Sequence, residues 1–167
     1  MPGTSTLSPD LTDARRAIDD LLDAADRCAE VWNDPVAPGK WSPAQILEHV
    51  ARSIEDSAKD MHGEPSRMMQ VPAPLRFLPR IVFRRVLRTG SLFKAKTNAG
   101  MNPEAGPASP AEGRERMESA WKELVKGRQS LQGPARSRIF GTVPGDQYVR
   151  FQALHARHHI PQFPTSS

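Results

Sequence analysis

Three Ser-Pro dipeptides, each followed by apolar residues at helical spacing, constrain the fold of this 167-residue chain more than any other feature. Serine is a favourable N-cap because its hydroxyl accepts a hydrogen bond from an unpaired backbone N–H. Proline fits the first helical position, where no donor is needed. Two of the serines are also followed by the Gln or Glu of a capping box. The sequence therefore predicts helices that begin at Ser8-Pro9, Ser42-Pro43 and Ser109-Pro110.

A fourth helix is predicted to begin near Gly145-Asp146 and to continue through the histidines of the run 154–159. Pro161 lies inside this pattern and should end or kink the helix. No segment shows the period-two alternation of a strand, and residues 133–134 and 141–144 carry loop signals. We therefore expect an all-α chain that folds as an antiparallel four-helix bundle.

A strongly basic segment separates the second and third predicted helices. No acidic residue occurs between Glu64 and Glu104, whereas the rest of the chain holds 15 of the 23 basic residues and all 19 acidic ones. Residues 71–98 are interpreted as an insert, opened by three prolines, in which apolar residues and arginines form a short amphipathic helix. The Pro/Ala/Gly-rich stretch 100–110 that follows predicts a flexible connection.

Three interpretations of the insert remain open. The favoured one is a lid packed over the bundle, its arginines paired with acids of the remaining chain. The second is a basic helix that lies on anionic lipid, which would make peripheral membrane contact possible. The third is a phosphate-contacting face for nucleic acid, which we consider the least favoured.

Histidines provide a candidate metal site. His155 and His159 are four residues apart, which places them one turn apart on one helix face. His49 shares an arc of the second helix with Ile46 and Val50, so it should also face inward. Helical bundles build metal sites from such facing positions, and three imidazoles would leave a position open for water or substrate. Surface or core histidines with ordinary hydrogen bonds are the alternative.

The run Lys40 to His49 resembles the second-helix signature of the DinB-like (DinB/YfiT-like) metalloprotein superfamily. The run Phe151 to Gln162 is similar to that family's last helix, with its H-x-x-H-H-x-x-Q pattern. Ile139-Phe140-Gly141-Thr142 resembles the turn that precedes this helix in one uncharacterised subgroup. The subgroup has His-Pro just before the turn, where this chain has Ser137-Arg138.

The resemblance implies a four-helix bundle with a divalent metal ion, zinc or nickel, held by His49, His155 and His159 and completed by water. It also implies an enzyme that activates water or a low-molecular-weight thiol, as a hydrolase or a thiol transferase acting on a small molecule, and a homodimer. No catalytic residue is assigned. Glu48 should face away from His49 because helix neighbours lie about 100° apart. Gln162 could orient a histidine, or it could be a polar residue of a fraying terminus.

Other residues have plainer interpretations. Cys28 is expected to be a small buried residue of the first helix, and Trp32 and Trp121 are expected in the core. Trp41 could line the mouth of the metal pocket. No run of 18 apolar residues exists, and Met1 to Asp10 lacks the pattern of a signal peptide. We expect one cytoplasmic domain over residues 1–167. A non-enzymatic binding module, which uses the insert at a membrane surface or nucleic acid, is the alternative function.

Overall fold

The helices begin where the sequence predicts. The computed structural model describes residues 7–68, 71–92, 97 and 99–165. Over these residues the chain forms five α-helices and one hairpin of two strands. The helices are α1 (Pro9–Asp26), α2 (Pro43–His62), α3 (Phe77–Thr89), α4 (Pro110–Ser130) and α5 (Gly145–His159). The prediction of a mainly helical fold is confirmed.

The predicted caps hold at two of the three Ser-Pro dipeptides. The Ser42 hydroxyl accepts from the Gln45 N–H (3.3 Å), and the Gln45 side chain accepts from the Ser42 N–H (3.0 Å), which completes the capping box. Ser109 accepts from the Glu112 N–H (3.2 Å). α1 begins after Ser8 as predicted, but the Ser8 side chain makes no cap hydrogen bond, so the hydroxyl cap expected there is wrong.

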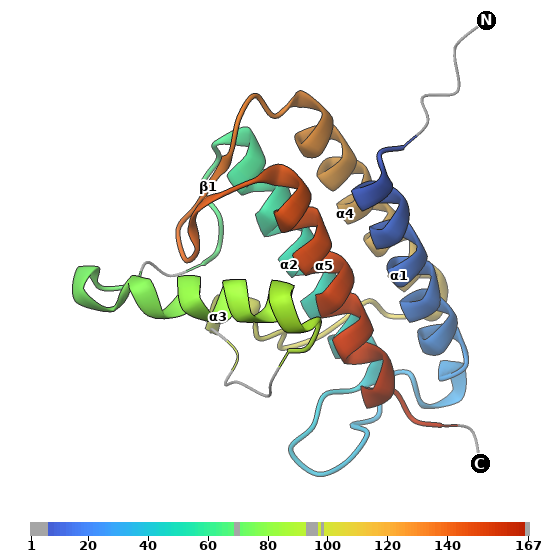
Figure 1. Cartoon of the computed structure of the whole chain (residues 1–167). Coiled ribbons are helices and arrows are strands. Elements are labelled where there is room, and N and C mark those ends of the chain that lie inside the picture. The colour runs from blue at the N-terminus through green and yellow to red at the C-terminus, as the bar shows by residue number, and fades with distance from the viewer. Residues whose placement is uncertain (1–6, 69–70, 93–96, 98, 166–167) are drawn as a thin grey trace, which may run out of the picture.

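Four helices form the body of the molecule. In Figure 1, α1, α2, α4 and α5 lie side by side, with α2 packed on α4 and α5, and α1 packed on α5. Their buried residues make one apolar core, to which α1 contributes Leu11, Ile18, Leu21 and Leu22, and α2 contributes Ile46, Leu47, Val50 and Ile54. This packing holds the inner faces of α2 and α5 against each other, and the candidate site lies between those faces.

A short β-hairpin corrects the prediction that the chain lacks strands. β1 (Ala135–Ser137) pairs antiparallel with β2 (Gly141–Val143), in the segment expected to be loop. The register aligns Ala135 with Val143, and both side chains are buried. Gly141 has a φ of +74°, which favours glycine, and a Cβ there would lie 2.6 Å from the Arg80 guanidinium. Strands of three residues are too short to show alternation in a sequence.

The basic insert contains the expected helix, but its arginines do not pair as predicted. α3 crosses the outside of α5 (Figure 1), and Phe83 packs its ring 5.1 Å from the ring of Phe151. Among the described residues, Arg80, Arg84, Arg85 and Arg88 make no ion pair with any acid. Many acids of the body are paired with arginines outside α3 instead. Part of the predicted insert, residues 93–96 and 98, lies outside the described residues.

The helices of the described part of the chain are amphipathic or short. None of them is both long and apolar enough to cross a bilayer. This finding agrees with the sequence, which has no run of 18 apolar residues.

Candidate metal centre

The three predicted histidines come together between α2 and α5. The Nε2 atom of His155 lies 3.1 Å from Nε2 of His49 and 3.0 Å from Nε2 of His159. All three ligand atoms lie within 4.8 Å of one another. The side chains are buried, with only 6–7% of each residue exposed. His155 and His159 lie one turn apart on α5, and His49 lies on α2. Each of the three therefore directs its Nε2 atom at one common point.

A ladder of polar side chains fixes α2 against α5 beside this point. Ser53 of α2 donates to the side-chain oxygen of Gln152 on α5 (3.0 Å), and the Gln152 amide donates to Ser57 (2.7 Å). One further turn away, Tyr148 donates to the buried carboxylate of Asp60 (2.6 Å). Because each bond joins α2 to α5, the ladder sets how His49 lies relative to the α5 histidines.

Carbonyl oxygens determine which ring nitrogens of two histidines carry hydrogen. His49 Nδ1 lies 2.8 Å from the backbone oxygen of Met101, and His159 Nδ1 lies 3.1 Å from the side-chain oxygen of Gln162. The Gln162 amide nitrogen donates to the His158 carbonyl (3.4 Å), which turns its oxygen toward His159. A carbonyl oxygen has no hydrogen, so each Nδ1 must donate. Nε2 of His49 and of His159 therefore presents a lone pair.

These lone pairs make the cluster a suitable cation site. Both point at His155 Nε2, which has at most one hydrogen and can satisfy only one of them. Nδ1 of His155 is buried and has no hydrogen-bond partner. Burial lowers the pKa of all three histidines, and it lowers that of His159 to about 3. At neutral pH the rings are uncharged, which is the form in which imidazole binds a metal ion.

Aromatic rings enclose the cluster. The Trp41 ring centroid lies 4.7 Å from that of His49 and 6.3 Å from that of His159. Its indole N–H donates to the Asn102 side chain (3.1 Å), which holds the ring in place. Phe151 stacks on His155 with 6.2 Å between ring centroids. Trp41, which is partly exposed, thus lies beside the rings of His49 and His159.

The remaining candidates lie outside the cluster. Glu48 points away from the cluster, as predicted, and pairs with Arg52 of its own helix (2.8 Å) and with Arg116 of α4 (3.0 Å). Cys28 is buried, and burial raises the pKa of its thiol, but it follows α1 rather than lying within it. Trp32 and Trp121 are in the core, as expected.

Sequence reasoning missed Met101, whose contribution to the site is its backbone carbonyl. Met101 ends the short 3₁₀ helix η3 (Ala99–Met101), at the start of the stretch predicted to be a flexible connection. That stretch is fastened to α2 instead. The Gln45 amide donates to the carbonyls of Pro103 and Glu104 (both 3.2 Å). Every residue type has a backbone carbonyl, so the sequence held no indication that this one would accept a hydrogen bond from His49.

Comparison with known proteins adds one match. A family model described as the DinB superfamily matches the chain over residues 10–163. No curated protein and no solved structure matches it. The matched region contains both helices that carry the three histidines.

Proposed function

Because the chain belongs to the DinB superfamily, as its sequence motifs indicated, we propose that it is a metal-dependent enzyme. In this proposal His49, His155 and His159 hold one divalent ion. One observation carries it: three buried Nε2 atoms converge, and at least two of them present lone pairs. Imidazole donors suit zinc and nickel as well as copper and iron, and we propose zinc or nickel, the two metals that the family resemblance implies.

The fold proposal follows from the same family. We propose that α1, α2, α4 and α5 form an antiparallel four-helix bundle, and that the domain extends over residues 1–167. The packing of these helices around one apolar core supports it. A cytoplasmic location stays a prediction of the sequence.

The proposed chemistry needs an activated small molecule beside the cluster. A divalent ion acts as a Lewis acid and lowers the pKa of a water or thiol that it coordinates. Three protein ligands leave at least one coordination position for such a molecule. Hydrolysis and transfer of a low-molecular-weight thiol both fit this arrangement. No carboxylate belongs to the cluster within the described part of the chain, so no catalytic residue is assigned.

The chain's own residues orient the ligands and limit the access of water. The Met101 carbonyl and the Gln162 side chain each hold an Nδ1 hydrogen, which aims the opposite nitrogen at the centre. Such partners fix ring orientation and raise the basicity of a metal-binding histidine. Trp41 and Phe151 cover the rings of the cluster. We propose Gln162 and Trp41 as positioning residues.

Metal content tests the proposal. The protein is purified without a histidine tag, and its bound metal is measured by mass spectrometry beside His49→Ala, His155→Ala and the control His62→Ala. We expect about one equivalent of zinc or nickel in the wild type and in the control, and none in the first two variants. A wild type that stays empty after reconstitution contradicts the proposal. A metal-loaded protein then enters a screen of ester and thiol substrates.

A further inference from the structure

The largest exposed apolar side chains gather at one end of α3. Among the described residues, five large hydrophobic residues are exposed, and four of them lie between positions 75 and 81. Leu75 ends the short 3₁₀ helix η2 (Ala73–Leu75), and Phe77, Leu78 and Ile81 belong to the first turns of α3. Phe77 is 55% exposed and Ile81 57%. Clustered exposed hydrophobic residues are typical of an interaction surface, whereas single ones are not.

The opposite face of α3 fixes this end in its exposed orientation. Phe83 and Val86 are buried, and the Phe83 ring lies 4.7 Å from that of Phe140 in the hairpin and 5.1 Å from that of Phe151 on α5. Because these contacts hold the inner face, the outer face cannot turn inward. Positions 77, 81, 84 and 88 follow helical spacing, so two hydrophobic residues and two arginines share one outward stripe.

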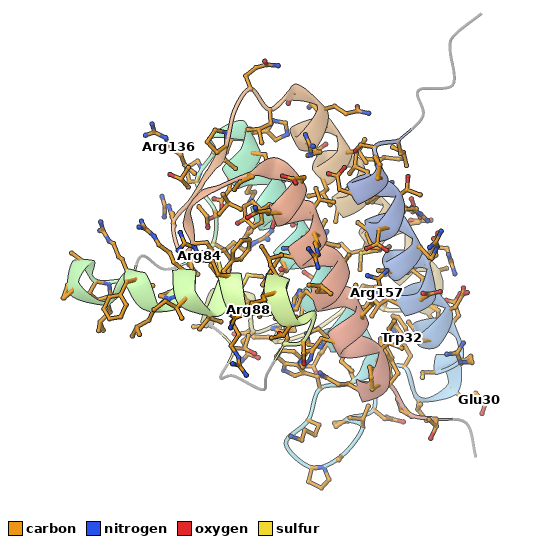
Figure 2. The ribbon with its side chains drawn as sticks, in the orientation of Figure 1. Glu30, Trp32, Arg84, Arg88, Arg136 and Arg157 are labelled. Carbon is orange, nitrogen blue, oxygen red and sulfur yellow. The ribbon has the colours of Figure 1, made fainter. Side chains whose placement is uncertain are left out.

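The arginines of this surface lack acidic partners, unlike many of those elsewhere. Arg116 of α4 pairs with Glu55 (2.5 Å), and Arg157 of α5 pairs with Asp13 (2.6 Å). Arg84 and Arg88 have no ion pair to any described residue, and the same holds for Arg136 of β1. Figure 2 shows these three on the side of the molecule away from α1. Positive charge is thus concentrated beside the exposed apolar residues.

We propose that this surface docks on an anionic lipid bilayer. We call it the α3 face, and it comprises the hydrophobic residues Leu75, Phe77, Leu78 and Ile81 and the arginines Arg80, Arg84, Arg85 and Arg88. Phenylalanine, leucine and isoleucine side chains enter the boundary between headgroups and acyl chains, while arginines bind the phosphates. Arg80 and Arg84 also line a surface cavity of about 490 Å³ beside the hairpin, which offers room for a headgroup.

Two other occupants fit the α3 face less well. A nucleic acid would pair with the arginines, but its phosphate backbone offers nothing for the apolar side chains to enter. A second copy of the chain, bound through the same face, would bring together two surfaces that each carry four arginines and no acidic residue. Such like-charge contacts oppose association. A bilayer matches both the charge and the apolar character of the surface.

Vesicle sedimentation tests the proposal with the full-length protein. Binding is measured to vesicles of phosphatidylcholine alone and to vesicles with about 30% phosphatidylserine, at low and high salt. The variants are the apolar pair Phe77→Ser/Ile81→Ser and the charge pair Arg84→Gln/Arg85→Gln. The matched control is Arg27→Gln/Val31→Ser, which changes an exposed arginine and an exposed valine outside the α3 face. Circular dichroism and thermal unfolding establish that each variant is folded.

We expect the wild type and the control to bind only the anionic vesicles, and less at high salt. Each of the two α3 pairs should weaken that binding by at least about tenfold. Equal binding by the charge pair and the wild type would overturn the proposal, as would no binding to anionic vesicles. Binding that survives in the apolar pair and is displaced equally by duplex DNA would indicate a polyanion site, and would also overturn it.

Discussion

Replacement of His155 by phenylalanine should separate a metal site from an ordinary histidine cluster, because the two accounts predict different stabilities. A ligand at a thousandfold excess over its dissociation constant stabilises a folded protein by about 4 kcal/mol. For a domain of this size that corresponds to a rise of about 8–16 °C in Tm. The wild type should show this rise on addition of zinc, and His155→Phe should lose most of it, because only two ligands remain.

The metal-free proteins give the sharper comparison. In the wild type, His155 has an unpartnered Nδ1 and can donate to only one of its two neighbours. A buried polar atom without a partner costs about 1–3 kcal/mol. Phenylalanine has a similar shape, removes that atom and extends the contact with Phe151. These gains offset the loss of the His155 donor, which leaves one more buried Nε2 without a partner at a cost of about 1–3 kcal/mol. We expect the two metal-free proteins to agree within about 1 kcal/mol.

Calorimetric unfolding with EDTA and with excess zinc measures both effects. The control His62→Ala removes a histidine outside the cluster and should keep the full zinc-dependent rise. If the histidines instead formed a satisfied hydrogen-bonded core, His155→Phe would strand two buried nitrogens and cost about 2–6 kcal/mol without metal. Such a loss, or an unchanged zinc response in His155→Phe, would refute the reasoning.

Three further predictions concern the fold that holds the site. Ser42→Ala should lower the free energy of unfolding, measured in urea, by about 1 kcal/mol, because it removes a side-chain cap. Ser8→Ala removes no cap and should leave that free energy nearly unchanged. Equal losses in the two variants would contradict the cap assignment. Gly141→Ala should cost about 1–2 kcal/mol, because φ is +74° and the Arg80 guanidinium must move; an unchanged midpoint would contradict this. Hydrogen bonds from Arg157 lower the pKa of Asp13 below its usual 3.8, so their stabilisation is present above that pH and is lost as the pH falls through the lower folded value. Urea unfolding at a series of acidic pH values should show a shallower decline in Arg157→Gln, and identical curves would contradict the assignment.

The sequence was sufficient to predict most of the helices and the pairing of His155 with His159, because both depend on spacing along one helix. Ser-Pro starts are local signals, and four residues separate His155 from His159 whatever the rest of the chain does. His49 lies on another helix, so its approach to the pair could be predicted only from the faces that α2 and α5 turn toward the core. Apolar periodicity indicates those faces well.

The errors arose where the outcome depends on contacts between distant segments. The α3 arginines were expected to pair with acids of the body, but many of those acids already have arginine partners, such as Arg15 for Glu118 and Arg157 for Asp13. Composition does not show which charges are already paired. The role of Met101 was missed for a related reason, since a backbone carbonyl is the same for every residue type. The hairpin strands were simply too short for a pattern.

X-ray absorption at the metal edge of the purified protein tests the central claim most directly, because it counts the ligands and identifies their elements. We expect one bound zinc or nickel ion. For zinc, the first shell should contain three imidazole nitrogens at about 2.0–2.1 Å and a smaller number of oxygen atoms from water. The metal-edge signal itself should fall to background in His159→Ala, because that variant keeps only two of the three ligands and, like His49→Ala and His155→Ala, should hold no metal. A shell with sulfur at about 2.3 Å, a shell of oxygen alone, or the same spectrum in His159→Ala would contradict the three-histidine site.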